Sequence, residues 1–288
     1  MGRALLIDCD RLRRPHKEDF TIRTTFHTHT SRCMHAEGAD EAYVLAALES
    51  GFSHIGFSDH TPWPYRDGFV SRMRMTVSEL DDYVRSVAAL RGEYAGKIEV
   101  SLGLEAEYVP EFRGWLAETR ERLALDYLIL GNHYEGPDER VYYGTVTGPE
   151  LVRRYADGTI RGLQSGLYDC LAHPDLFLLN YPRFDAECRA AAHDISAAAR
   201  GMGVPMEFNT SGLGHPAKSG RGLGYPCLEF WQVAAQEGVS AIIGVDAHRP
   251  ERMRETAVYD LSVQHLRALG IPRIETLMGD KEKLESIA

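Results

Sequence analysis

The sequence predicts an α/β fold, a distorted seven-stranded (β/α)7 barrel of the TIM-like kind. Three observations support this prediction. Seven short apolar, β-branched runs alternate with longer stretches of helical spacing. Metal-binding residue types stand at or just after most of these runs. No Gly-x-Gly-x-x-Gly turn follows any of them, which argues against an open dinucleotide-binding sheet and favours a closed or nearly closed barrel.

The predicted strands recur along the chain in a regular order. In sequence they span 21–26, 54–58, 98–106, 125–131, 167–172, 204–209 and 240–245. The stretch DEAYVLAALESG between the first two has apolar positions at helical spacing and ends on Gly51, which fits a C-terminal cap. Similar stretches are DDYVRSVAALRGEY, FRGWLAETRERLA, AECRAAAHDISAAARGMG and LEFWQVAAQEG. This alternation of strand and helix predicts a parallel sheet.

The domain organisation is predicted to be simple. We expect residues 1–20 to form an N-terminal extension and residues 21–288 to form one barrel, because α/β barrels of this length occur as single units. The N-terminal segment lacks the apolar core of a signal peptide, and no run approaches the roughly 20 apolar residues that span a bilayer. The cysteines are odd in number and scattered, so we expect a cytoplasmic protein with reduced thiols.

The net charge of the chain limits the classes of partner that it is expected to bind. A formal net charge of −10 disfavours nucleic acid, because nonspecific binding to phosphates requires clustered basic residues. Acidic residues can instead gather around metal ions, whose positive charge still admits an anionic substrate. We therefore expect a small phosphorylated substrate to be compatible with the charge, with neither nucleic acid nor a membrane as a partner.

The segment FHTHTSRCMH, residues 26–35, contains three of the 12 histidines: His27, His29 and His35. In a strand, side chains two positions apart share a face, so His27 and His29 would form a chelating pair. Further metal-binding residue types stand at later strand ends: Asp59, His60, Glu105, His133, His173, Asp246 and His248. Barrel enzymes place their chemistry at the C-terminal ends of strands, so this distribution predicts a metal site there. The histidines at 16, 54, 193 and 265 lie elsewhere and are not expected to bind metal, and His215 is left open.

Two long loops interrupt the pattern on the same predicted face. Residues 61–79 combine aromatic side chains with Arg66, Arg72 and Arg74, and residues 209–226 are rich in Gly, Ser and Pro. Loops of this length within a compact domain are usually functional. We therefore expect both loops to contribute to the site.

The motifs HTHT, SDHTP, GLEAEY, GNH, AHPD, EFNTSG and GVDAH, in this order, resemble those of the polymerase-and-histidinol-phosphatase (PHP) family. The similarity runs from about residue 24 to about residue 251, and within the family it is closer to the monofunctional histidinol-phosphatases. The resemblance implies a distorted barrel of seven β-α units, in agreement with the strand count.

The resemblance also implies a centre of three divalent metal ions. One ion would be held by His27, His29, Glu105 and Asp246. The second would share Glu105 and be held by His133 and His173, and the third by His35, His60 and His248. Imidazoles and carboxylates without thiolates suit zinc, iron or manganese. Asp59, next to His60, is expected to orient a ligand rather than to bind a metal.

The activity implied by the resemblance is hydrolysis of L-histidinol phosphate to L-histidinol and phosphate. A metal-activated hydroxide would attack the ester, and Glu105, Asp246 and His248 would be the catalytic members of the ligand set. For the substrate we expect additional contacts from Arg74, Asn209, Arg221 and Arg249, because arginine presents a planar fork that matches phosphate.

Three alternative hypotheses for the function remain open. A PHP phosphoesterase that acts on nucleotides or short oligonucleotides would use the same ligands, and a panel of substrates separates it. A metal-dependent amidohydrolase also begins with His-x-His, but it typically has a modified lysine after the fourth strand, where this chain has Asn132 and His133. A catalytically silent, metal-stapled binding module would be inert towards every phosphate ester.

Overall fold

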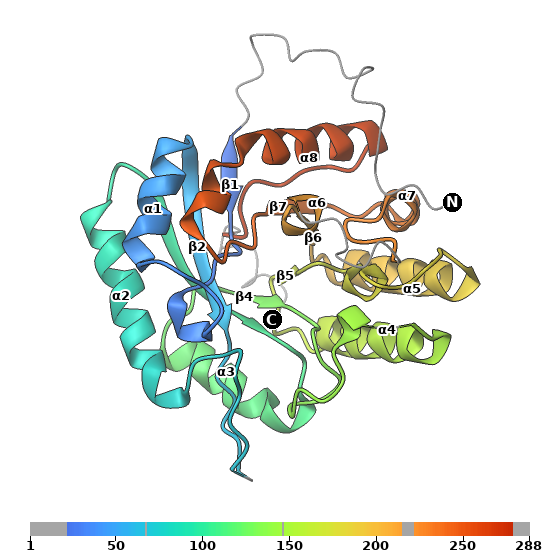
Figure 1. Cartoon of the computed structure of the whole chain (residues 1–288), viewed down its shortest axis with the longest axis horizontal. Helices are drawn as coiled ribbons and strands as arrows, with labels where there is room; N and C mark the ends of the chain where they lie inside the picture. Colours follow the sequence, from blue (N-terminus) through green and yellow to red (C-terminus); the bar gives the residue numbers. More distant parts are fainter. Residues whose placement is uncertain (1–21, 67, 146, 215–221, 279–288) are drawn as a thin grey trace, which may run out of the picture.

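The computed structural model describes residues 22–66, 68–145, 147–214 and 222–278. Seven parallel strands form one sheet whose spatial order follows the chain order. They are β1 (Arg23–Thr25), β2 (Phe52–His60), β3 (Glu99–Ala106), β4 (Tyr127–Leu130), β5 (Cys170–Leu171), β6 (Met206–Asn209) and β7 (Ala241–Gly244). Figure 1 shows the strands at the centre with helices around them. The predicted seven-stranded barrel is confirmed.

The seam between the first and last strands is closed by backbone pairing beyond the strands themselves. Thr28 and Ala247 form an isolated parallel bridge. His29 N donates to Ala247 O at 3.0 Å, and Ala247 N donates to His27 O at 3.3 Å. The barrel is therefore nearly closed, and the residues that follow β1 lie beside those that follow β7.

Every strand has bounds somewhat different from those of its predicted run, and β5 and β2 differ most. The predicted run 167–172 contributes only two residues to β5, because β4 pairs with Cys170 and Leu171 and β6 pairs with Leu171 alone. β2 is longer than the predicted run 54–58 and pairs with β3 as far as His60 and Glu105. His60 is therefore the last residue of a strand rather than the start of a loop.

The helices cover the outside of the barrel. Five of them match the predicted stretches: α1 (Asp40–Glu49), α2 (Leu80–Glu93), α3 (Arg113–Arg122), α5 (Ala186–Met202) and α7 (Leu228–Glu237). The prediction did not include α4 (Pro149–Gln164), the short α6 (Ser211–Gly214) or α8 (Thr256–Leu269). In Figure 1, α4 and α5 lie side by side, in keeping with their extensive packing. No helix in the described ranges is long and apolar enough to cross a membrane.

Local sequence explains why these helices form, as α5 illustrates. Its alanine-rich sequence has high helix propensity. The side chain of Asp185 caps the helix by accepting hydrogen bonds from the backbone N–H groups of Glu187 and Cys188. Gly203 ends the helix with a φ of 66°, a left-handed conformation that glycine adopts at little cost.

The interior of the barrel is filled below the strand ends by a small apolar cluster around Tyr127. The Tyr127 hydroxyl lies 2.8 Å from Phe26 O and 2.9 Å from Phe57 O. Gly56 and Gly103 leave room for this ring, since a Cβ at either position would lie within 2.6 Å of a Tyr127 atom. The packed ring forms a floor, so a site within the barrel can open only towards the C-terminal strand ends.

The predicted domain division stays a prediction. The proposed extension 1–20 lies outside the described residues, as do the last residues of the proposed barrel from 279 onward.

Candidate metal centre

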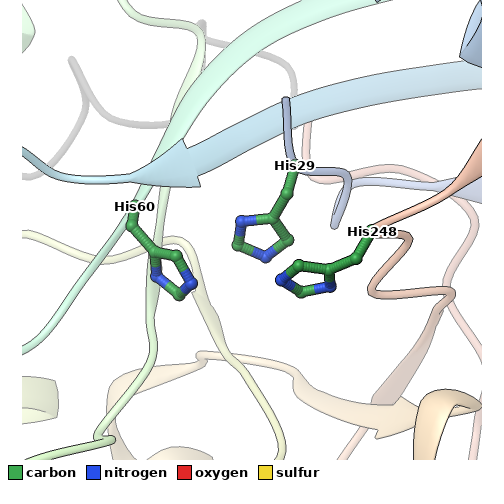
Figure 2. A group of neighbouring side chains, drawn as sticks. All are labelled: His29, His60 and His248. Atoms are coloured by element: carbon green, nitrogen blue, oxygen red, sulfur yellow. The ribbon is translucent and has the colours of Figure 1, made fainter. Parts of the chain in front are cut away.

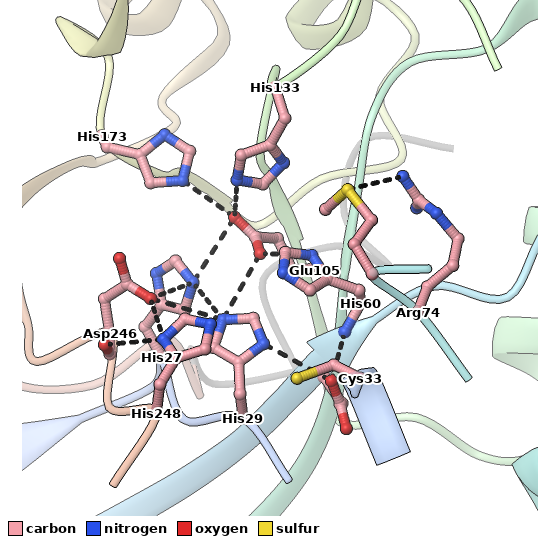
Figure 3. Close-up of polar contacts among 12 residues, drawn as sticks. His27, His29, Cys33, His60, Arg74, Glu105, His133, His173, Asp246 and His248 are labelled. Carbon is pink, nitrogen blue, oxygen red and sulfur yellow. Dashed lines mark hydrogen bonds and ion pairs between the residues drawn. The ribbon is translucent and has the colours of Figure 1, made fainter. Parts of the chain in front are cut away.

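The structure brings all nine of the predicted metal ligands together at the C-terminal end of the barrel. Eight of them stand at or just after strand ends, whereas His35 follows the 3-10 helix Ser31–Cys33. Figure 3 shows most of the set, with the imidazole rings arranged around one carboxylate. The nine are His27, His29, His35, His60, Glu105, His133, His173, Asp246 and His248.

Glu105 lies at the centre of this arrangement and is 1% exposed. Its Oε1 is 2.9 Å from His173 Nε2, 3.3 Å from His133 Nε2 and 3.4 Å from His27 Nε2. Its Oε2 is 3.0 Å from His60 Nδ1. One carboxylate therefore faces imidazoles from four different strand ends.

Glycine makes room for this carboxylate. Gly131 follows β4, and a Cβ there would lie 2.1 Å from Oε1 of Glu105 and 2.5 Å from its Cδ. Both atoms belong to a buried side chain that contacts several imidazoles, so it could not move without disturbing them. The glycine of the GNH motif thus serves packing at the centre rather than turn formation.

The outer nitrogens of His27 and His29 face carboxylates, so their inner nitrogens can bind a metal ion once they have lost their protons. His27 Nδ1 lies 2.8 Å from Glu207 Oε1, and His29 Nδ1 lies 3.4 Å from Asp59 Oδ1. A proton on each Nδ1 satisfies these carboxylates and leaves a lone pair on each Nε2. The two Nε2 atoms are 3.1 Å apart, so the two rings lie together as expected from the sequence, and their chelating role stays a prediction.

Asp59 is fixed by hydrogen bonds of its own. Its Oδ2 accepts from the backbone N–H and the hydroxyl of Thr30, and its Oδ1 accepts from the backbone N–H of His60. It therefore contacts the outer nitrogen of His29 and not the centre of the cluster. This position suits the predicted orienting role.

His35 and His248 repeat the same pattern at the outer edge of the cluster. His35 Nδ1 lies 2.7 Å from Cys33 O, and His248 Nδ1 lies 3.3 Å from Asp246 O. Both rings are therefore protonated on Nδ1, because a carbonyl oxygen only accepts. Figure 2 shows His248 next to His29 and His60, and the rings of His29 and His248 stack with their centroids 4.0 Å apart.

The residues fit divalent cations on two grounds. Glu105 Oε2 and His173 Nδ1 are buried and accept or donate no hydrogen bond, although His60 Nδ1 lies 3.0 Å from Oε2, and a cation would relieve the cost of burying the carboxylate. Several groups of three ligand atoms also lie within 4.8 Å of one another: His29, His60 and His248; His27, His29 and Asp246; His27, Glu105 and His173. Because His29 takes part in two of these groups, it is nearer to the outer ligands than the resemblance implies.

The electrostatics of the centre also favour cations. Burial would lower the pKa of His27, but the carboxylates of Glu207, Glu105 and Asp246 raise it well above its usual range. Burial would likewise raise the pKa of Glu105, yet the surrounding imidazoles of His133, His27 and His60 hold it well below its usual range. The cluster therefore attracts positive charge, which protons can supply and metal ions would supply in their place.

Sequence reasoning missed Glu207, which supports three residues of the centre. Its Oε1 faces His27, and its Oε2 accepts hydrogen bonds from His173 N at 3.0 Å and Asn209 Nδ2 at 2.9 Å. The sequence could have indicated Glu207, because it stands two positions before Asn209 in β6 and alternate residues of a strand share a face. Asn209, predicted to contact substrate, also donates to Asp246 Oδ2 at 3.2 Å.

Sequence reasoning also missed Glu107, which links Arg74 to His133. Arg74 is 2% exposed and pairs with Glu107 at 3.0 Å and with Glu139 at 2.9 Å. Glu107 Oε1 in turn lies 3.3 Å from His133 Nδ1. The guanidinium of Arg74, predicted to contact phosphate, is thus enclosed in a buried ion pair. This geometry favours support of His133 over direct contact with a substrate.

The other predicted contacts lie in different surroundings. Arg249 is exposed and pairs with Glu37 at 3.0 Å, outside the residues that line the cavity described below. Arg221 and His215 lie outside the described residues, as does His16. Away from the cluster, His54 contacts Ser101 Oγ at 2.6 Å and His193 is exposed on α5. His265 is buried on α8.

A cavity of about 420 Å³ opens over the cluster. Its volume suits a small ligand. Five histidines and Asp246 form one part of its wall, and aromatic, apolar and hydroxyl side chains with one arginine form the rest. The lining residues outside the ligand set are Arg72, Met73, Tyr134, Tyr142, Leu176, Ser211 and Tyr225.

Comparison with known proteins agrees with this geometry. The PHP domain model matches residues 25–211. A probable histidinol-phosphatase of Deinococcus radiodurans is 31% identical over 236 residues, covering 78% of this chain and 85% of the relative. The histidinol-phosphatase of Bacillus subtilis is 27% identical over 254 residues, covering 77% of this chain and 92% of the relative.

Solved structures share the fold. Histidinol phosphate phosphatase from Lactococcus lactis, crystallised with zinc, L-histidinol and phosphate, superposes with a TM-score of 0.70 at 20% identity. The match covers 90% of this chain and 98% of that one. A putative histidinol phosphatase from Listeria monocytogenes gives a TM-score of 0.68, also at 20% identity, over 82% of this chain and 100% of that one. By its sequence and by the placement of its motifs at the strand ends, the chain belongs to the PHP domain family.

Proposed function

We propose that this protein is a metal-dependent phosphomonoesterase that hydrolyses L-histidinol phosphate to L-histidinol and phosphate. The observation that carries the proposal is Glu105, one buried carboxylate enclosed by imidazoles from four strand ends beneath an open cavity. Relatives named as histidinol-phosphatases match most of the chain, and the Lactococcus lactis protein of the same fold binds zinc, L-histidinol and phosphate.

The proposed centre holds three divalent ions, with zinc, iron and manganese as the candidates. His27, His29, Glu105 and Asp246 would hold one ion, and Glu105 with His133 and His173 a second. His35, His60 and His248 would hold the third. When bound, the ions would lower the pKa of a water molecule and neutralise charge on the phosphate oxygens. The protein would contribute ligand orientation, chiefly through Asp59, Glu107 and Glu207.

The candidate metal ligands that line the cavity would lie next to the phosphate ester of the substrate. Asp246 and His248 both line it, and Glu105 lies directly beneath. Burial, followed by the charge of His29, lowers the pKa of His248 to about 3, so this imidazole is neutral at physiological pH and its Nε2 is available as a ligand. Asn209 holds Asp246 through Oδ2, which leaves Oδ1 directed at His27 and His29.

The aromatic part of the cavity wall suits the amino-alcohol end of histidinol phosphate. Tyr134, Tyr142 and Tyr225 line the cavity and present ring faces and hydroxyl groups. Aromatic faces attract cations, and a flat imidazole ring can stack on them. A nucleotide would gain no comparable advantage from the acidic surface of this chain, and a cytoplasmic location with no nucleic-acid partner stays a prediction.

A phosphate-release assay with purified, metal-loaded protein tests the proposal. The substrates are L-histidinol phosphate, nucleoside monophosphates, sugar phosphates and short oligonucleotides, with metal content measured on the same sample. We expect the highest kcat/KM for histidinol phosphate. An equal or higher kcat/KM for a nucleotide or oligonucleotide would show that histidinol phosphate is not the preferred substrate. The protein would still be a phosphoesterase. Inertness towards every ester would favour a silent metal-stapled module.

A further inference from the structure

We propose that Arg72 is the side chain that binds the substrate's phosphate beside the metal ligands. The inference deepens the proposed function and rests on it for the identity of the ester. Arg72 lines the cavity over the centre and is exposed. Among the described residues that line this cavity, it is the one arginine or lysine. Arg74 and Arg249, which the sequence favoured, are both engaged by carboxylates.

The absence of a partner distinguishes Arg72. It forms no hydrogen bond or ion pair with any residue in the described part of the chain. The chain contains 42 acidic residues against 32 basic ones, so carboxylates to pair with it are abundant. A guanidinium that faces a cavity without such a partner keeps its planar fork available for an anion.

The backbone on either side of Arg72 is anchored. Ser71 Oγ donates to Glu139 Oε1 at 2.6 Å and accepts from the backbone N–H of Met73 at 3.1 Å. Arg74 Nε donates to the same Glu139 oxygen at 2.9 Å, and its other nitrogens pair with Glu107. Glu139 thus clamps the residues that flank Arg72. The segment is held in place before a ligand arrives, which reduces the entropy lost when the ligand binds.

The same clamp connects Arg72 to the metal centre. Glu107 contacts both Arg74 and His133, so the loop that carries Arg72 is fixed relative to one of the proposed ligands. Figure 3 shows Arg74 to one side of the cluster, with a dashed line to the sulfur atom of Met73 and none to Glu105 or the imidazoles. Arg74 therefore positions the segment, and the exposed Arg72 lines the cavity.

The chemistry of the substrate decides which of its ends Arg72 would bind. Histidinol phosphate has one anionic group, the phosphate, whereas its amine is cationic and would be repelled by a guanidinium. Metal ions occupy some phosphate oxygens in a centre of this kind, and the remaining oxygens need donors. A guanidinium supplies two parallel N–H donors to such oxygens.

Binding of inorganic phosphate to the metal-loaded protein, measured by calorimetry, tests the inference. The variants are Arg72→Ala, Arg72→Lys and the matched control Arg66→Ala, an exposed arginine of the same loop that does not line the cavity. We expect Arg72→Ala to weaken phosphate binding about ten- to hundredfold, Arg72→Lys to weaken it less, and Arg66→Ala to leave it unchanged. The KM for the ester and the inhibition constant of product phosphate should rise in parallel.

Two further measurements exclude indirect effects. Metal content and the unfolding midpoint should equal those of the wild type, because Arg72 has no described partner to lose. A phosphate Kd for Arg72→Ala within about twofold of the wild-type value would overturn the inference. So would absence of phosphate binding to the metal-loaded wild type. Because the probe is phosphate itself, the result stands even if the wild type fails to hydrolyse histidinol phosphate and the proposed function falls.

Discussion

The Nε2 atoms of His35 and His248 lie 3.0 Å apart, although the Nδ1 atom of each ring is committed to a backbone carbonyl. Two imidazole lone pairs at this separation repel each other unless a positive charge lies between or beside them. His27 and His29 repeat the relationship at 3.1 Å. The centre is therefore a site in which protons and metal ions compete for the same lone pairs.

This competition predicts the pH dependence of metal binding. The pKa values of His27 and His29 are raised well above 6.5. Without metal, protons on these rings therefore stabilise the fold, fully so below pH 6.5. This stabilisation is lost as the pH rises through the raised pKa values. Metal binding must displace those protons, so metal affinity should rise with pH across the same window and fall in acid. Metal content and activity, measured together from about pH 5 to 8, should decline together in acid. Loss of activity with all metal retained would identify a different titrating group.

Glu105→Gln should remove most of the activity while leaving the fold intact. The amide has the size of the carboxylate but lacks the charge needed beside two cations. Replacing residues that merely support ligands costs about 10- to 100-fold, so we expect a loss of more than about hundredfold in kcat, with reduced metal content. The exposed Glu111→Gln serves as a control. Near-normal turnover with normal metal content would refute the bridging role of Glu105.

Gly131→Ala should damage the centre without altering any ligand. The new methyl group would meet Glu105 Oε1 at 2.1 Å, so the carboxylate must move. We expect metal content and kcat both to fall at least about tenfold. Gly114→Ala in α3, where a Cβ meets nothing within 4 Å, should leave both unchanged. Metal analysis and steady-state kinetics on the two alanine variants test this prediction. Equal metal content and equal kcat in the two variants would contradict the packing role of Gly131.

Arg74→Met should destabilise the fold because it leaves Glu107 and Glu139 without their buried partner. Breaking such a pair costs about 3–5 kcal/mol, measured as the free energy of unfolding in urea. The exposed Arg249→Met should cost less than about 0.5 kcal/mol. Adding Glu107→Gln to Arg74→Met should recover part of the loss, because an amide tolerates burial better than an unpaired charge. A loss below about 1 kcal/mol in the single variant would argue against the buried ion pair.

The fold and the positions of eight of the nine candidate ligands were predictable because one periodic feature encodes both, whereas His35 was included only through the family resemblance. Each of the seven strand runs is followed by its helix, and in a parallel barrel the ends of all strands meet on one face. His27 and Asp246, far apart in the sequence, could be placed together for this reason alone. The roles of the nine residues as ligands stay a prediction until metal is measured.

What could not be predicted depends on contacts between distant segments. Arg72 and Arg74 look alike in the sequence, and only the pairing of Arg74 with Glu139, 65 positions later, determines which of the two is buried. Glu107 and Glu207 are ordinary inward-facing strand residues until their neighbours are known. Similarly, β5 is short because its extent depends on the strands beside it and not on its own apolar run.

The seam between β1 and β7 determines when this centre can be assembled during synthesis. His35 and His248 are 213 positions apart, so a ribosome that adds about 5–20 residues per second needs roughly 10–40 seconds to travel between them. Throughout that interval the nascent chain exposes HTH without the residues that complete its ligand shell. In the proposed assignment, the ions that need Asp246 or His248 could therefore be bound only after nearly the whole chain has been synthesised.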